Sequence, residues 1–163
     1  MEPIFLLSLP RSGSTLVQRV LATHDEIATA SEPWILLPFV YIFRQNGTLS
    51  EYDPQHFLPQ AVADFCDQLP ENENDFMHEI KDMVIKLYTK ASNGKTRYFI
   101  DKTPRYHLIV DELMTMFPSA KFIILWRNPL SIVASTMDTW SKGKWNLHRH
   151  HIDFGDQVFY RIT

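Results

Sequence analysis

Residues 10–15, Pro-Arg-Ser-Gly-Ser-Thr, have a composition suited to binding an anion. A short apolar run precedes them and apolar residues at helical spacing follow, which predicts a strand, a tight turn and a helix. The first N–H groups of a helix have no intrahelical partner, and the helix dipole favours negative charge there. Arg11 adds positive charge, Gly13 permits close approach to the backbone, and Ser14 and Thr15 add hydroxyl donors. An ordinary turn with an N-capping serine is the alternative.

Arg127 and Ser135 form a second candidate anion site. Arg127 follows Lys121–Trp126, which is the strongest buried-strand signal in the sequence. Asn128 is expected to cap the next helix, with Pro129 in its first turn and Ser135 two turns along. An arginine and a hydroxyl directed at one anion make a phosphate clamp. Taken alone, a salt-bridged arginine and a serine in a tight helix contact explain the pattern equally well.

Asp101 follows another short strand signal, at Arg97–Ile100, and it keeps a nucleotide kinase open as an alternative. Such an enzyme needs a carboxylate for magnesium at the end of a core strand. The phosphate loop of these kinases, G-x-x-x-x-G-K-[ST], is absent, because no lysine precedes Ser14 or Thr15. The strand ending at Trp126 runs into an arginine and not into a carboxylate. The kinase hypothesis therefore depends on Asp101 alone.

The elements that must position these residues alternate between strand and helix patterns. The strand signals are Ile4–Leu9, 97–100 and 121–126, and the helical patterns are 16–21, 34–40, 57–65, 76–87, 108–117 and 130–137. This order predicts an α/β fold in which a parallel β-sheet is flanked by helices, with a P-loop-like nucleotide site. Ligands of such sheets bind at the carboxyl ends of the strands, where all three polar loops begin.

Composition sets the broad class of protein. With 45% hydrophobic and 21% charged residues, the 163-residue chain is typical of one globular domain. A net charge of -3 gives no indication of nucleic acid or an anionic membrane as partner. The single cysteine, Cys66, allows no intrachain disulfide and fits a reducing compartment. The N-terminal apolar run is too short for a spanning helix and lacks signal-peptide flanks, so we expect a cytoplasmic protein.

Three motifs each follow a predicted strand, in the chain order 10–15, 101–104 and 127–135. Together they resemble the motifs of sulfotransferases that use 3'-phosphoadenosine-5'-phosphosulfate (PAPS). Residues 10–15 look like the family's 5'-phosphosulfate loop, and Arg127 with Ser135 looks like its 3'-phosphate motif. Residues 101–104, Asp-Lys-Thr-Pro, resemble a segment whose lysine faces the transferred group. The pattern, which covers most of residues 3–140, is closer to the bacterial and tyrosylprotein-type branch than to the cytosolic phenol and steroid branch.

The resemblance implies a role for each residue. Arg11 and the backbone of Ser12, Gly13, Ser14 and Thr15 would hold the 5'-phosphosulfate, and Arg127 with Ser135 would hold the 3'-phosphate. Lys102 would stabilise the leaving group, and Glu32 would be the base that takes the proton of an acceptor hydroxyl. An N-terminal helix carboxylate is the alternative for Glu32. No metal is expected, and the acceptor class stays open.

Other features are weaker. His148, His150 and His151 lack the spacing of a usual zinc site, and one of them is an alternative base or acceptor contact. The tryptophans, including Trp34, are expected in the core. Family members are longer, so residues 1–163 are expected to form one sulfotransferase-like domain without the C-terminal part of the family domain. A non-catalytic nucleotide-binding fragment is the remaining alternative.

Overall fold

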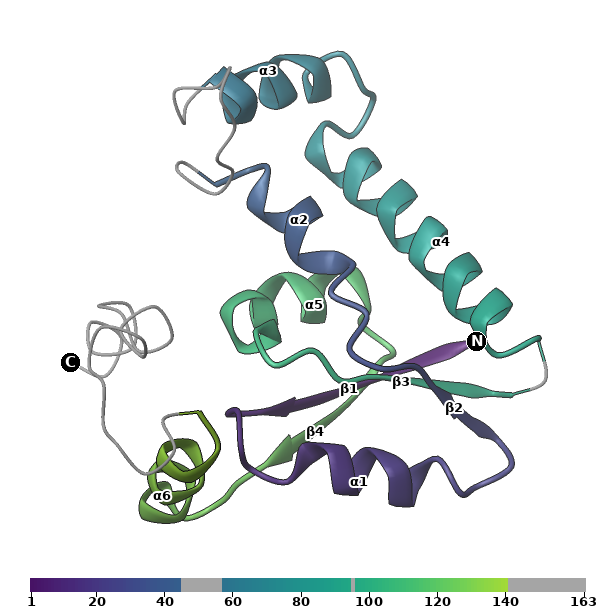
Figure 1. Cartoon of the computed structure of the whole chain (residues 1–163). Helices are drawn as coiled ribbons and strands as arrows, with labels where there is room; N and C mark the ends of the chain where they lie inside the picture. Colours follow the sequence, from purple (N-terminus) through teal and green to yellow (C-terminus); the bar gives the residue numbers. More distant parts are fainter. Residues whose placement is uncertain (45–56, 95, 141–163) are drawn as a thin grey trace. The chain divides into compact units, whose positions relative to one another are not determined.

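The computed structural model describes residues 1–44, 57–94 and 96–140 (Figure 1). Its elements are β1 (Glu2–Ser8), α1 (Ser14–Leu21), β2 (Ile27–Thr29), α2 (Leu36–Tyr41), α3 (Phe57–Cys66), α4 (Glu73–Ala91), β3 (Tyr98–Asp101), the 3₁₀ helix η1 (Tyr106–Ile109), α5 (Val110–Met116), β4 (Lys121–Leu125) and α6 (Pro129–Trp140). The chain divides into two compact units, residues 1–126 and the residues from Arg127 onward.

The first unit contains a parallel sheet in the order β2-β3-β1-β4. β1 pairs with β3 on one side and with β4 on the other, and β3 pairs with β2. Because all three pairs are parallel, β1 and β3 end at the same edge of the sheet. The segments after them, which carry residues 10–15 and Lys102, therefore begin side by side. This confirms the predicted α/β fold with a parallel sheet and flanking helices.

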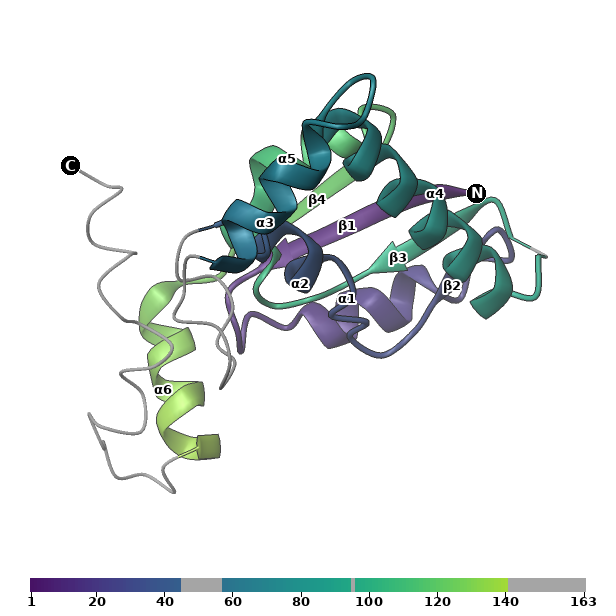
Figure 2. The same ribbon diagram turned by 90° about the horizontal axis from the view of Figure 1, so that it is seen from above.

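Alternate side chains of β1 face two separate cores. Phe5 and Leu7 belong to the larger core, which α2, α4 and α5 cover. Ile4 and Leu6 belong to the smaller one, against which residues of α1 pack. Within the first unit, the views in Figures 1 and 2 show α1 on one face of the sheet and α2, α4 and α5 on the other. Burial on both faces explains why β1 reads as a continuous apolar run.

The structure differs from the predicted strands at two places. β2, a strand of only three residues that the sequence pattern does not predict, pairs through Ile27–Thr29 with β3. Residues 121–126 have the strongest buried-strand signal in the sequence, but among the described residues β4 lies at an edge of the sheet. Ile124 is 74% exposed and Trp126 is 82% exposed. Apolar content alone does not distinguish a central strand from an edge strand.

The predicted helix over 34–40 begins later, at Leu36, and Trp34 is not a core residue. Trp34 has φ 57°, in the left-handed region, and is 43% exposed. The middle block is helical as predicted. α4 contributes Ile80, Val84 and Tyr88 to the larger core.

Candidate active site

The loop between β1 and α1 folds tightly around two left-handed residues. Gly13, the N-cap of α1, has φ 93°, and Arg11 has φ 64°. Glycine adopts this conformation at little cost, whereas most other residues are strained there. A Cβ placed on Gly13 would meet no atom within 4 Å, so the space beside this backbone is open. The backbone conformation therefore demands glycine, and the open space leaves room for a ligand.

Several polar groups of this loop have no partner in the described parts of the chain. Ser12 is buried, and its Oγ makes no hydrogen bond there. The amides of Leu16 and Val17 donate to the carbonyl of Gly13, but those of residues 13–15 donate to no backbone carbonyl in the same part of the chain. A buried hydroxyl left unpaired costs about 1–3 kcal/mol. These groups are therefore arranged to receive an external acceptor such as a phosphate or sulfate oxygen.

Gln18 connects α1 to the segment that carries Glu32. It is buried, and its Nε2 donates to Thr29 Oγ1 at 2.7 Å and to the Ala30 carbonyl at 2.8 Å. Thr29 Oγ1 in turn donates to the Ile100 carbonyl of β3 at 2.8 Å. These bonds fix the chain where it leaves β2. Glu32 thus follows a segment held by both α1 and β3.

Glu32 and Lys102, which are far apart in sequence, form an ion pair. Lys102 Nζ lies 2.5 Å from Glu32 Oε1. The Lys102 side chain is only 5% exposed, whereas that of Glu32 is 36% exposed. An ammonium taken out of water needs a negative partner, and Glu32 supplies it. The remaining exposure of Glu32 leaves the carboxylate accessible from solvent.

A pocket of about 400 Å³ joins this ion pair to helix α1. Its walls come from α1, from the chain after β2 and from the end of β3. The lining residues are Thr15, Gln18, Arg19, Ala22, residues 29–32 and Lys102. Thr15 is the last residue of the segment 10–15, the candidate anion loop, so one hollow contains part of that loop together with Glu32 and Lys102. The structure thereby brings together three of the residues that the sequence singled out.

Asp101 has a structural environment and not that of a magnesium ligand. It is fully buried. Its Oδ2 accepts hydrogen bonds from Tyr88 at 2.5 Å and Tyr106 at 2.9 Å, and its Oδ1 accepts one from Thr103 at 2.8 Å. Burial raises the pKa of the Asp101 carboxyl, and the three hydroxyl donors and Lys102 oppose that shift. With both oxygens engaged and no exposure, Asp101 does not fit the role that the kinase alternative requires.

The second candidate anion site lies at the start of the second unit. The predicted cap is confirmed, because the amide of Leu130 donates to Asn128 Oδ1 at 2.9 Å and α6 begins at Pro129. Arg127 directly precedes this cap, and Ser135 lies within α6. That Arg127 and Ser135 bind the same ligand as Arg11 stays a prediction. His148, His150 and His151 lie outside the described residues.

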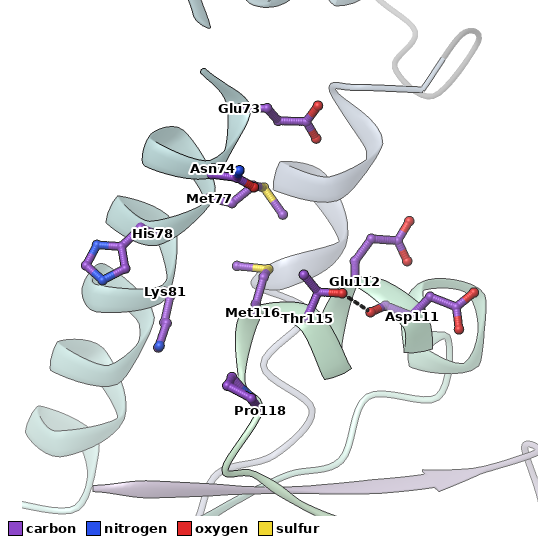
Figure 3. A pocket seen from close by; sticks show the side chains of 10 residues that line it. All are labelled: Glu73, Asn74, Met77, His78, Lys81, Asp111, Glu112, Thr115, Met116 and Pro118. Atoms are coloured by element: carbon purple, nitrogen blue, oxygen red, sulfur yellow. Dashed lines mark hydrogen bonds between the residues drawn. The ribbon is translucent and has the colours of Figure 1, made fainter. Parts of the chain in front are cut away.

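A different hollow, of about 440 Å³, lies between α4 and α5 and contains none of the predicted site residues (Figure 3). Met77, Met116 and Pro118 form an apolar part of its lining, and Glu73 and Glu112 are among its charged residues. Glu112 already forms an ion pair with Arg44. Because no strand-end loop contributes to it, we do not assign the chemistry to this hollow.

No group of three or more histidine, cysteine, aspartate or glutamate side chains in the described residues has the geometry to hold a metal ion. Within the same ranges, no helix combines the length and the apolar character needed to cross a membrane.

The sequence reasoning missed Gln18 and the hydroxyl partners of Asp101. Gln18 lies among the apolar positions of a short helix, and a polar side chain buried there must find a hydrogen-bond partner. That position was the signal from which its role could have been predicted. Tyr88 gave no such signal. Its hydroxyl reaches Asp101 from α4, and only the fold reveals that contact.

Comparison with known proteins identifies the family. The model of the "Sulfotransferase family" matches residues 3–161. The chain is 33% identical over 138 residues to "Nodulation protein NoeE" of Sinorhizobium fredii (strain NBRC 101917 / NGR234). The matched region covers 83% of this chain and 31% of NoeE. It is 32% identical over 138 residues to an uncharacterized protein of Aquifex aeolicus (strain VF5), covering 82% of this chain and 16% of that protein. The chain therefore belongs to the sulfotransferase family, and it spans less than a third of either relative.

The role of Gln18 can be tested by an isosteric substitution. Gln18→Glu replaces the donating amide with an oxygen that faces the Ala30 carbonyl, so both bonds are lost and a buried charge is introduced. We expect the free energy of unfolding, measured in urea, to fall by about 2–4 kcal/mol. The same change at Gln68, which is exposed, is the matched control and is expected to stay within about 0.5 kcal/mol. Equal effects at the two positions would show that Gln18 does not hold the Glu32 segment.

Proposed function

We propose that the protein transfers the sulfuryl group of PAPS to a hydroxyl group of an acceptor. The observation that carries the proposal is the pocket in which Thr15 of the anion loop lies with the Glu32–Lys102 ion pair. Sulfuryl transfer requires an anion site for the donor, a base for the acceptor proton and a cation for the leaving group. This pocket holds a candidate for each of the three.

The donor's phosphosulfate fits the loop before α1. The N–H groups of residues 13–15 donate to no backbone carbonyl of the described residues, and the positive end of the α1 dipole adds to their attraction for anionic oxygens. The Ser12 hydroxyl, which has no partner among the same residues, offers one more donor. Arg11 lies in the same loop and supplies a guanidinium for the phosphosulfate. In this proposal the loop fixes the sulfur at the mouth of the pocket.

Glu32 and Lys102 then divide the chemistry between them. The acceptor hydroxyl gives its proton to the Glu32 carboxylate while its oxygen forms a bond to sulfur. The bond between sulfur and the bridging phosphate oxygen breaks, and the electron pair stays on that oxygen. Lys102 stabilises this developing charge. In the free protein their ion pair gives the buried ammonium a negative partner until the donor binds.

The adenosine end of the donor is assigned to the second unit. Arg127 and the hydroxyl of Ser135 would bind the 3'-phosphate, which ADP and ATP lack. The capped N-terminus of α6 favours an anion in the same place. This assignment makes the 3'-phosphate the feature by which the protein selects its donor. The acceptor in the proposal is any hydroxyl compound that reaches Glu32.

Nucleotide selectivity is the first test. Adenosine 3',5'-bisphosphate is expected to raise the melting temperature more than ADP or ATP with magnesium. At 100 times its dissociation constant the ligand adds about 2.7 kcal/mol of stability. Arg127→Ala should remove the preference. Equal stabilisation by all three nucleotides would contradict the proposed donor.

The roles of Glu32 and Lys102 are tested by turnover. Glu32→Gln is expected to lower the release of adenosine 3',5'-bisphosphate from PAPS by about 10²- to 10⁴-fold, the usual contribution of a positioned base. Lys102→Met removes the cation and should also lower it. Binding of the bisphosphate product should persist in Glu32→Gln, because in this proposal Glu32 takes the acceptor's proton and makes no bond to the nucleotide.

Glu79→Gln, an exposed change on α4, is the control for Glu32→Gln. Glu32→Gln also leaves a buried ammonium without its ion partner, so its melting temperature must be measured alongside. Breaking a fully buried ion pair lowers the free energy of unfolding by about 3–5 kcal/mol. Because Glu32 is about one-third exposed, we expect a smaller loss here. Full turnover in Glu32→Gln would rule out Glu32 as the base.

A further inference from the structure

Trp34 holds a strained conformation next to the candidate base. Its φ of 57° is in the left-handed region, which costs a non-glycine residue about 1–2 kcal/mol. Its side chain remains 43% exposed, so burial of the ring is not what offsets the strain. Strained residues persist only where their surroundings determine the conformation, and they gather at functional sites. The contacts of Trp34 therefore need an explanation.

Two hydrogen bonds hold Trp34 in this conformation. Its backbone N–H donates to Thr103 Oγ1 at 3.2 Å. Its indole Nε1–H donates to Glu32 Oε2 at 3.3 Å. Glu32 consequently has a donor on each carboxylate oxygen, since Lys102 Nζ contacts Oε1. The indole fixes the oxygen that the lysine does not touch.

Thr103 links this tryptophan to the most rigid part of the site. Its hydroxyl accepts from the Trp34 backbone and donates to Asp101 Oδ1 at 2.8 Å. Asp101 is in turn held by the hydroxyls of Tyr88 and Tyr106. Because Lys102 lies between Asp101 and Thr103 in the chain, the contacts close a ring from Thr103 through Trp34, Glu32 and Lys102 back to Thr103. The buried Thr103 hydroxyl accepts the Trp34 N–H directly, so it joins the segment that carries Glu32 to the segment that carries Lys102.

We propose that Thr103 is a positioning residue for the Glu32 carboxylate and that it acts through Trp34. The proposal rests on the function proposed above, in which Lys102 turns from Glu32 to the donor. At that moment Glu32 loses its partner at Oε1, and the indole N–H at Oε2 keeps the carboxylate directed at the acceptor hydroxyl. Thr103 keeps the indole in place because it fixes the Trp34 backbone. Neither Thr103 nor Trp34 needs to touch the sulfuryl group.

Three threonine variants separate this role from a general effect on folding. Thr103→Val keeps the shape of the side chain but removes both hydrogen bonds of the hydroxyl. Thr103→Ser keeps the hydroxyl and is the conservative rescue. Thr89→Val is the matched control, because the hydroxyl of Thr89 on α4 bonds the carbonyl of Ile85 in its own helix and no other group of the described residues.

The first readout needs no turnover. In ¹⁵N–¹H spectra of the protein, the indole N–H signal of Trp34 is assigned by its loss in Trp34→Phe. Glu32→Gln is expected to shift this signal, because its hydrogen-bond acceptor changes from a carboxylate to an amide. Thr103→Val should shift it as well, whereas Thr103→Ser and Thr89→Val should leave it near the wild-type position. An unmoved signal in a folded Thr103→Val protein overturns the proposal.

The second readout measures kcat and the KM for PAPS separately, with water as the acceptor. Thr103→Val is expected to lower kcat by about 10- to 100-fold, the range for a displaced catalytic group, with the KM for PAPS unchanged. Thr103→Ser should restore kcat. A change in KM alone, or a Thr103→Ser protein as slow as Thr103→Val, contradicts a positioning role.

Trp34→Phe keeps the test decisive if Thr103→Val does not fold. It retains an aromatic ring at an exposed position and removes only the N–H that contacts Glu32. Its kcat should fall by about the same 10- to 100-fold. Full turnover in Trp34→Phe overturns the proposal. Absence of turnover in the wild-type protein would instead count against the proposed function, while the indole signal would still decide the role of Thr103.

Discussion

The buried carboxylate of Asp101 is the group on which the rest of the site depends. Burying an ionisable group is costly unless hydrogen bonds compensate it, and here three hydroxyls do so. Those hydroxyls come from α4, from η1 and from the segment after β3. Tyr106 also accepts a bond from the Leu36 amide at 3.3 Å, where α2 begins. Asp101 therefore fixes the chain next to Lys102, through Thr103, and the chain four residues after Glu32, through Tyr106 and Leu36.

The residues that hold the site together differ from the residues proposed to react. Asp101, Thr103 and Tyr106 are buried and fully engaged with one another, while Glu32 remains partly exposed. In the proposed reaction Glu32 and Lys102 can consequently exchange partners when a donor binds, while the buried residues behind them keep their contacts. The anion loop has its own support in the N-terminus of α1, whose position relative to Glu32 is held by Gln18.

The sequence predicted the parts of the molecule that depend on local pattern. The β1–loop–α1 unit, the cap at Asn128 and the long amphipathic α4 follow from apolar spacing and helix-capping residues. It also placed Glu32 and Lys102 in one site, although only through resemblance to a family. It could not give β2, the edge position of β4 or the conformation of Trp34. Each of these depends on contacts between distant segments, such as Trp34 with Thr103, for which no local signal exists.

A crystal structure of the protein with adenosine 3',5'-bisphosphate would test the proposed donor site most directly. We expect the 5'-phosphate against the amides of residues 13–15 and the 3'-phosphate in contact with Arg127 and Ser135. Glu32 and Lys102 should lie beside the 5'-phosphate, where the sulfuryl group would be attached. A nucleotide bound with its 3'-phosphate away from Arg127, or bound outside the loop before α1, would contradict it.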